Sequence, residues 1–270
     1  MSQSPLRPMS VGNVVSAGMV LYRSNFKSYL LQSIFAHLWI LLPIYGWAKY
    51  AAISGLISRL AFKELISKPE SVSHARETIN PRMWSFLGVG FGIALRLFGL
   101  YIAIYVAIFL AFLIPVLILG QQGGAILGAI AALVLFIVGI VVIIRLYSRW
   151  SIAEVPLAVE ENITGGGQSI DRSWELTEGA VGRIQYIVVV AFLVTLPIQI
   201  VTGYVPSIFQ VRLDPNTQAY WIVYFINLAF SLLGGAVVMP FWQAIKSVMY
   251  YDLRSRREGL DLQMRDRRER

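Results

Sequence analysis

Four stretches of the sequence are long and apolar enough to cross a lipid bilayer. A spanning helix needs about 20 apolar residues, because the hydrocarbon core is about 30 Å thick and each residue rises about 1.5 Å. Residues 101–119 and 125–144 carry no polar side chain apart from Tyr hydroxyls, and residues 184–203 and 221–242 carry a few uncharged ones. This pattern predicts four membrane helices.

Two further segments, residues 29–45 and 47–65, give a weaker helical pattern. The first contains three polar side chains, and the second is interrupted by four charged residues: Lys49, Arg59, Lys63 and Glu64. Pro43 and Gly46 supply a turn between the segments. We expect a helical hairpin that either spans the membrane imperfectly or re-enters on the side from which it came.

The basic residues orient these helices, because cytoplasmic loops carry the excess of Lys and Arg. Residues 1–28 hold three basic residues, 63–82 four, 145–183 four and 246–270 eight, which places 19 of the 23 on one side. The short links between the helices of each pair contain one, Arg212. The distribution predicts that both termini are cytoplasmic.

The expected fold is an all-α, polytopic membrane bundle of six helices in three hairpins, with amphipathic helices at the interface. Its three parts are an amphipathic cytoplasmic segment, a membrane domain and a basic cytoplasmic tail, at residues 1–28, 29–250 and 251–270. The membrane helices are expected at about residues 29–45, 47–65, 99–119, 125–145, 184–204 and 221–245. Before each hairpin lies a similar segment that begins with serine, at Ser10, Ser71 and Ser169.

Composition agrees with a membrane protein. Hydrophobic residues make up 57% of the 270 residues and charged residues 14%, whereas soluble domains have about 25% charged residues. This excludes a soluble enzyme with an ordinary wet surface and a disordered chain. The absence of cysteine excludes disulfides, thiolate metal sites and cysteine nucleophiles. No cleaved signal peptide is expected at the N-terminus.

A few polar residues lie inside or beside the apolar segments and are candidates for a site. Charged side chains within a membrane usually have a function, so Arg59 is expected either to face a polar cavity or an acidic partner, or to snorkel from a shallow hairpin. Arg96 is expected at the headgroups as an interfacial anchor. Glu154 and Glu160 are possible partners for Arg59, Arg96 or Arg172, or are solvated. His37 is a helix-packing residue or a proton-linked one.

No catalytic set can be assembled from the sequence. The two histidines, His37 and His74, form no zinc-binding motif and no Ser-His-Asp order. The glycines at 165–167 are not followed by Lys-Ser or Lys-Thr, so they do not form a Walker loop. We therefore expect no catalytic residue, no metal and no cofactor.

The C-terminal stretch, residues 250–270, contains seven arginines and five acids. Such a basic cluster beside a membrane helix attracts anionic lipid headgroups. The acids favour helical pairs four residues apart, such as Asp252 with Arg256 and Asp261 with Arg265. We expect a helix that leaves the membrane and docks on the inner face or on a partner, and no binding of nucleic acid.

Two motifs resemble the membrane domain attached to some bacterial glycerophosphodiester phosphodiesterases, and its stand-alone, cyanobacterial-type relatives of unknown function. The first motif is Arg172-Ser173-Trp174-Glu175-Leu176-Thr177-Glu178-Gly179, and the second is Tyr250-Tyr251-Asp252-Leu253-Arg254-Ser255-Arg256-Arg257-Glu258-Gly259-Leu260-Asp261-Leu262. The resemblance implies a helical membrane fold in a bacterial plasma membrane or a cyanobacterial thylakoid membrane. It implies no catalytic residues, and the membrane segments leave no room here for the phosphodiesterase barrel.

Three functions remain open from the sequence. The first is a non-enzymatic membrane protein that scaffolds or assembles other membrane components, with lipids, a membrane-protein partner or a second copy of the chain as its contacts. The second is a transporter or lipid-handling protein, because Pro115, Pro197 and Pro240 interrupt apolar helices. The third is a membrane enzyme that acts on lipid headgroups.

Overall fold

The structure is a computed structural model that describes residues 9–259, and every regular element in that range is a helix. The order along the chain is α1 (Val11–Ser24), α2 (Phe26–Trp39), α3 (Tyr45–Leu65), α4 (Val72–Ile79), η1 (Asn80–Arg82), α5 (Met83–Trp150), α6 (Glu154–Val159), α7 (Gly166–Thr177), α8 (Val181–Gln199), η2 (Ile200–Tyr204), α9 (Val205–Gln210) and α10 (Gln218–Glu258). The all-helical fold class predicted from the sequence is confirmed for this range.

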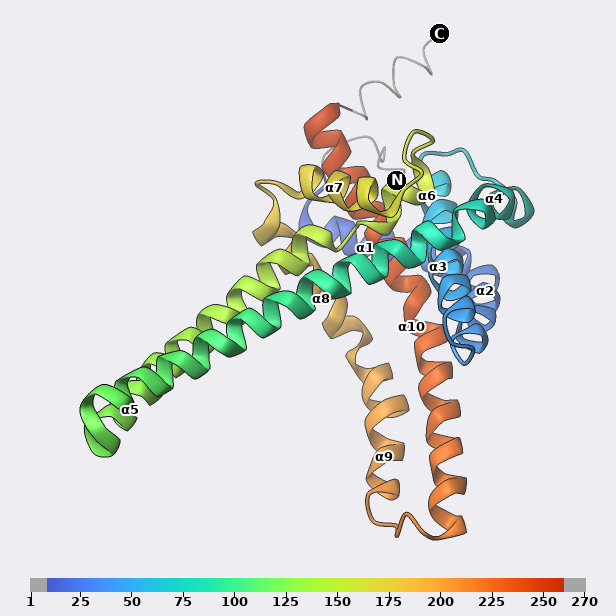
Figure 1. The fold of residues 1–270 in the computed structure, drawn as a ribbon. Coiled ribbons are helices and arrows are strands. Elements are labelled where there is room, and N and C mark those ends of the chain that lie inside the picture. Colours follow the sequence, from blue (N-terminus) through green and yellow to red (C-terminus); the bar gives the residue numbers. More distant parts are fainter. Residues whose placement is uncertain (1–8, 260–270) are drawn as a thin grey trace.

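The molecule has a compact body from which two long arms extend in different directions (Figure 1). The body consists of α1, α2, α3, α4, α6, α7 and the second half of α10, residues 234–258. The α5 arm comprises residues 91–147, and the α10 arm comprises residues 189–233. The arms carry most of the exposed large hydrophobic side chains, whereas the buried core lies in the body.

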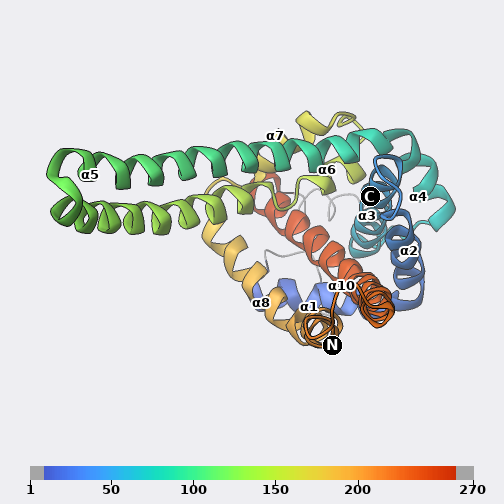
Figure 2. The ribbon, with the colours of Figure 1, turned by 60° about the horizontal axis from the view of Figure 1, so that its bottom comes forward.

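The α5 arm consists of two helical limbs that are joined by a sharp bend. Its backbone leaves the helical range at Gly120, where φ is 76°, and two limbs run side by side from this bend (Figure 2). The limbs approach closely: a Cβ atom built on Gly128 would lie 2.6 Å from the carbonyl oxygen of Phe112. Small residues permit this approach, which is how apolar helices pack when lipid surrounds them.

The α10 arm pairs α8, η2 and α9 with the first half of α10. Pro197 lies inside α8, and its ring cannot donate the helical hydrogen bond. A π-helical segment, Ile200–Tyr204, follows directly. At Gly234 the two sides touch, because a Cβ there would lie 2.0 Å from the hydroxyl of Thr202. The predicted helices at 184–204 and 221–245 therefore extend to residue 210 and over 218–258.

Three helical stretches are long and apolar enough to cross a membrane: Val72–Val159, Val181–Gln210 and Gln218–Glu258. In their most apolar windows only 11%, 22% and 17% of the residues are buried inside the protein. So many exposed apolar side chains are unfavourable in water, since each apolar patch of a soluble protein rarely exceeds a few hundred Å². The exposed apolar surfaces of the arms are suited to a lipid environment.

The first predicted hairpin differs from the other two. It consists of α2 and α3, joined by a turn at residues 40–44, and Gly46 lies inside α3 rather than in the turn. From Ala52 to Phe62 nearly every side chain of α3 is buried in the body, including Arg59. Exposed apolar side chains of this hairpin lie at its turn, as at Leu41 and Leu42, and along α2, as at Leu31.

The serine-started segments have two kinds of structure. Ser10 and Ser71 are N-caps, because their side chains accept hydrogen bonds from the amides of Asn13 and His74 at 3.2 and 3.3 Å. Ser169 instead lies within α7, which begins at Gly166 and packs against α5 and α6. The third segment, 169–184, does not form one helix, because the chain is broken between α7 and α8.

The second half of α10 passes through the middle of the body. Its side chains are buried on almost all sides from Gly234 onward, and it contacts α1, α2, α3 and α8. A Cβ on Gly235 would lie 2.6 Å from Nε2 of His37 on α2. The Gly234-Gly235 pair is therefore a close-packing point.

We expect Gly235→Val to destabilise the protein, because the added side chain would overlap the His37 ring, which is held by a 2.8 Å hydrogen bond to the Ser33 carbonyl. Overpacking of this kind costs about 1–3 kcal/mol. The melting temperature in detergent should fall by several degrees. Gly99→Val is the control, since no atom lies within 4 Å of a Cβ at that exposed helical position; equal melting temperatures for the two variants would contradict the packing.

Candidate functional site

The charged residues singled out in the sequence gather in the body, at the end where both arms begin. Most of them surround the second half of α10, which carries Lys246, Asp252, Arg254 and Glu258. Two side-chain clusters, a pair of arginines at the end of α6 and one ion pair beside a cavity make up this region.

The first cluster, which we term the acid–arginine network, joins α7 and α10 through Glu160. The Glu160 carboxylate accepts from Arg172 Nε at 3.0 Å and from the Tyr250 hydroxyl at 2.5 Å. Arg172 also donates to Glu258, which in turn accepts from Arg254 at 2.7 Å. The network therefore connects the two motifs on which the family resemblance rests, and the pairing of Glu160 with Arg172 is one of those considered from the sequence.

Arg172 stays charged in this position. Partial burial disfavours its charged form, but the hydrogen bonds and negative charges of Glu160 and Glu258 outweigh burial and raise the pKa of the guanidinium. The Glu160 side chain is only 10% exposed. Because buried carboxylates need compensation by charge or hydrogen bonds, the network holds α7 against α10.

The second cluster surrounds Asp252, whose side chain is 2% exposed. Its carboxylate accepts from the Met9 amide at 2.6 Å, from Arg183 at 2.8 Å and from Arg256 at 3.1 Å. The expected pair of Asp252 with Arg256 is thus present, while the pair of Asp261 with Arg265 lies outside the described residues. Asp252 ties the start of α1 and the start of α8 to α10.

The first family-like motif encloses the end of α5. The hydroxyls of Ser173 and Thr177 both donate to the carbonyl of Arg149, at 2.8 and 3.2 Å. The Arg149 guanidinium lies over the Trp174 ring, 3.6 Å from its centre, and donates to the Trp174 carbonyl. Helix ends leave carbonyls without helical partners, and this motif supplies partners for the α5 arm.

The two glycines of the motifs end helices. Gly179 has φ 74° between α7 and α8, and Gly259 has φ 61° after α10. Side chains with a Cβ rarely adopt this left-handed conformation. In contrast, Tyr251 is a buried core residue, and Arg257 donates to the Glu178 carbonyl at 2.7 Å.

Arg59 does not pair with Glu154 or Glu160, as had been considered. It donates through Nε and Nη2 to Glu70 and through Nη1 to the Ala158 carbonyl at 3.0 Å, and only 7% of it is exposed. Glu70 follows α3 in the loop that returns to α4. Arg59 thus faces an acidic partner, which was one of its two predicted environments, and is not a snorkelling side chain.

Arg82 was not recognised from the sequence. Its Nη1 donates to the carbonyls of Leu157, Glu160 and Ile163 at 2.9–3.1 Å, and its Nη2 donates to that of Glu161. Arg59 and Arg82 together neutralise the carbonyl end of α6 and the turn after it, where a helix presents partial negative charge. No sequence pattern encodes a contact with main-chain carbonyls.

Glu154 pairs with Lys246 at 2.7 Å beside a cavity of about 260 Å³. Tyr50 and Tyr147 also line the cavity. Within the body nearby, Gln243 accepts from Ser58 at 2.9 Å and donates to Ser54 at 2.5 Å. These three side chains place hydrogen-bonded polar groups within the packing of α3 against α10.

The two remaining candidates are apart from these groups. His37 is buried, donates from Nδ1 to the Ser33 carbonyl at 2.8 Å, and lies edge-on to Tyr50, 5.2 Å between ring centres. These are the contacts of a helix-packing residue, which is one of the two roles predicted for His37. Arg96 is exposed on the α5 arm and donates to the Gly92 carbonyl at 3.2 Å. The glycines at 165–167 begin α7, where the Gln168 side chain accepts from the Gly165 amide.

Comparison of the chain with known protein families, with curated proteins and with solved structures gives no match. Among residues 9–259, no group of three or more His, Asp or Glu side chains has the arrangement of a metal site. The side chains described above therefore carry the functional argument by themselves.

We expect Glu160→Gln to lower the unfolding free energy by about 1–3 kcal/mol, the usual cost of leaving a buried polar group without its charged partner. The substitution removes the charge that both Arg172 and Tyr250 contact. Thermal unfolding in detergent measures the effect.

Glu175→Gln is the matched control for Glu160→Gln. Glu175 contacts the same arginine at 3.5 Å, but its side chain is 67% exposed, and surface ion pairs contribute about 0–1 kcal/mol. If both variants melt at the wild-type temperature, the acid–arginine network does not hold the body together.

Proposed function

We propose that this chain is an integral membrane protein with six membrane-embedded helices in three hairpins, whose body lies at the cytoplasmic face. The described chain begins and ends at the body, where Met9 contacts Asp252 and Arg256. The bend at Gly120 and the loop at residues 211–217 lie at the far ends of the arms (Figure 1). Arg212 is in that loop, whereas most basic residues belong to the body, as the positive-inside rule requires.

We propose further that the α2–α3 hairpin re-enters rather than spans. The 14 residues of α2 reach about 21 Å as a helix, against about 30 Å of hydrocarbon. The buried half of α3 belongs to the body and holds Arg59. The hairpin turn in Figure 1 ends well short of the tip of the α10 arm.

The chain contains no cysteine, so single cysteines can map this topology. Gln121→Cys and Asn216→Cys lie at the arm tips, and Lys68→Cys lies in an exposed loop of the body. A membrane-impermeant maleimide added outside intact cells should label only the two arm tips. Lys68→Cys should react only after permeabilisation, and Leu42→Cys, in the first turn, from neither side. Labelling of Lys68→Cys and Asn216→Cys from the same side would overturn the topology.

We propose that the protein acts as a non-catalytic scaffold for other membrane components. The observation that carries this proposal is that one ion-paired body holds two apolar arms apart. Several charged residues that might serve chemistry, such as Glu160, Arg172 and Asp252, are engaged in contacts that join helices of the body. The arms, in contrast, leave most of their apolar side chains exposed.

Such arms suit contacts with other membrane helices. Association within lipid depends on close packing of helix surfaces, because lipid tails are as apolar as the side chains. The exposed surface of each arm is apolar along its length, with aromatic residues such as Phe109 and Phe225. We expect helices of a partner protein, or the arms of a second copy, to pack against these surfaces.

Photo-crosslinking in native membranes tests the scaffold. A photoreactive residue replaces Leu133 on the α5 arm or Phe225 on the α10 arm, which are 58% and 61% exposed. Each should give a protein adduct of fixed mass and stoichiometry. The same residue at Glu77, exposed on α4, is the control and should give no such adduct. Adducts with lipid alone from both arms would refute the scaffold.

A second candidate, a transporter, is favoured by the cavity beside Glu154 and Lys246. A charged pair with two tyrosines at a cavity of about 260 Å³ is the kind of polar site found between transporter helices. Arg59 belongs to the Glu70 pair and does not line this cavity. The family resemblance of the two motifs, and with it a bacterial plasma or thylakoid membrane, also stays a proposal.

A further inference from the structure

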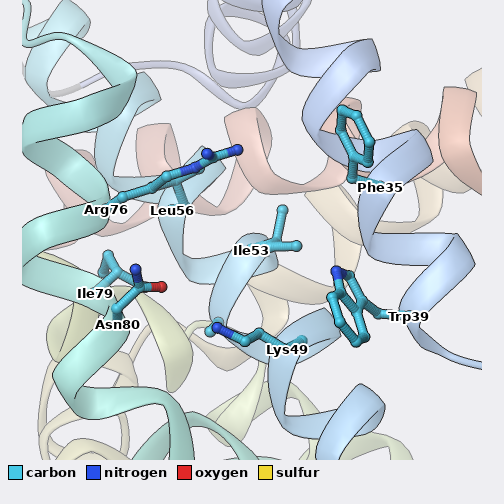
Figure 3. A pocket seen from close by; sticks show the side chains of 9 residues that line it. Phe35, Trp39, Lys49, Ile53, Leu56, Arg76, Ile79 and Asn80 are labelled. Atoms are coloured by element: carbon cyan, nitrogen blue, oxygen red, sulfur yellow. The ribbon is translucent and has the colours of Figure 1, made fainter. Parts of the chain in front are cut away.

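A cavity of about 330 Å³ lies between α4 and the two helices of the first hairpin, α2 and α3. Its volume falls in the range of about 300–1,000 Å³ that is typical of small-molecule sites. Figure 3 shows side chains from all three helices facing it, with Phe35 and Trp39 on α2, Lys49 and Ile53 on α3, and Arg76 on α4.

The charge of this cavity is one-sided. Lys49 and Arg76 supply two positive groups from different helices, and no acidic residue lines the cavity within the described part of the chain. Arg76 Nη2 donates to the side-chain oxygen of the buried Gln32 at 2.7 Å, which fixes the guanidinium without neutralising it. Lys49 lies 5.7 Å from the centre of the Tyr45 ring.

These two cations differ from the basic residues of the body that form buried or half-buried ion pairs. Arg59, Arg183 and Lys246 each have a carboxylate partner. Among residues 9–259, neither Lys49 nor Arg76 forms an ion pair. Basic groups at the inner surface of a membrane attract anionic headgroups, so the cavity is suited to an anion from outside the chain.

The wall of the cavity is apolar on the side of α2 and α3. Phe35, Trp39 and Ile53 form this wall, and it continues into the exposed apolar turn of the hairpin at Leu38 and Leu41. A soluble anion without apolar groups would bury no apolar surface against this wall. A molecule with an anionic head and apolar chains would bury both of its parts.

We propose that this cavity binds the headgroup of an anionic phospholipid, with its phosphate between Lys49 and Arg76. A phosphate oxygen accepts charge-assisted hydrogen bonds from both groups, and the Asn80 amide faces the same space (Figure 3) for a headgroup hydroxyl. The acyl chains then follow Phe35 and Leu38 toward the hairpin turn. The bound lipid fixes the hairpin at the interface. This inference rests on the membrane placement proposed above and not on the scaffold role.

Native mass spectrometry of the full chain, stripped of lipid in mild detergent, tests the proposal. Phosphatidylglycerol should bind with one tight equivalent, and phosphatidylcholine, which carries the same phosphate beside a positive group, should bind at least tenfold more weakly. Glycerophosphate should not displace the lipid. If phosphatidylcholine binds as tightly, or if glycerophosphate competes as well as phosphatidylglycerol, the lipid assignment is wrong.

Substitutions locate the site. Lys49→Gln and Arg76→Gln should each weaken phosphatidylglycerol binding about tenfold, while Lys49→Arg should retain most of it. Lys68→Gln is the matched control, because Lys68 is exposed and lies outside the cavity lining. Equal affinities for Lys49→Gln and Lys68→Gln would overturn the proposal.

A variant that keeps both charges distinguishes loss of the binding site from misfolding of the charge variants. Ile53→Trp fills the cavity and leaves both charges in place, and it should also weaken binding. Wild-type affinity in this variant would place the lipid elsewhere. Since the cysteine labelling reports membrane placement independently, a wild-type protein that shows the expected labelling pattern but binds no phosphatidylglycerol refutes the headgroup site alone.

Discussion

The second half of α10 carries charged side chains into the interior of the body, and the rest of the structure depends on pairing them. Asp252 is almost fully buried, and Lys246, Arg254 and Glu258 are partly so. An unpaired charge in such a position costs several kcal/mol. Their partners come from segments far away in sequence: Glu154 at the start of α6, Arg172 on α7, Arg183 on α8 and the Met9 amide before α1. Pairing the charges on this one helix therefore brings the other helices of the body into contact with it.

Much of the fold follows from apolar length alone. Residues 101–119 and 125–144 are long and apolar enough to cross a membrane, which predicted two helices, and they form the two limbs of the α5 arm. The environment of residues 47–65 was not predictable from the sequence alone. A helix with buried polar residues has the same sequence pattern in a membrane and in a protein interior. Arg59 resolves the ambiguity only through Glu70, which lies in a loop whose path no local pattern specifies. The positive φ of Gly120, in contrast, coincides with the start of the expected link at residues 120–124.

The interactions within the candidate site were predictable only where they are local. Asp252 and Arg256 are four residues apart on one helix, and that spacing alone predicts their contact. The link from Arg172 to Glu258 spans 86 residues, and the four carbonyls bound by Arg82 belong to the main chain, which has no sequence signature. The two family-like motifs contain most residues of the acid–arginine network, the side chains that contact the end of α5 at Arg149, and two helix-ending glycines.

The body also determines how the two arms relate to each other. The α10 arm is continuous with the buried half of α10, which carries the paired charges around Asp252. The α5 arm is held at Trp150 by the enclosing contacts of Ser173, Trp174 and Thr177 with Arg149. Both anchors meet at α7, whose Arg172 also joins the acid–arginine network. The contacts of α7 with α5 and with α10 therefore determine how the two arms are oriented relative to each other.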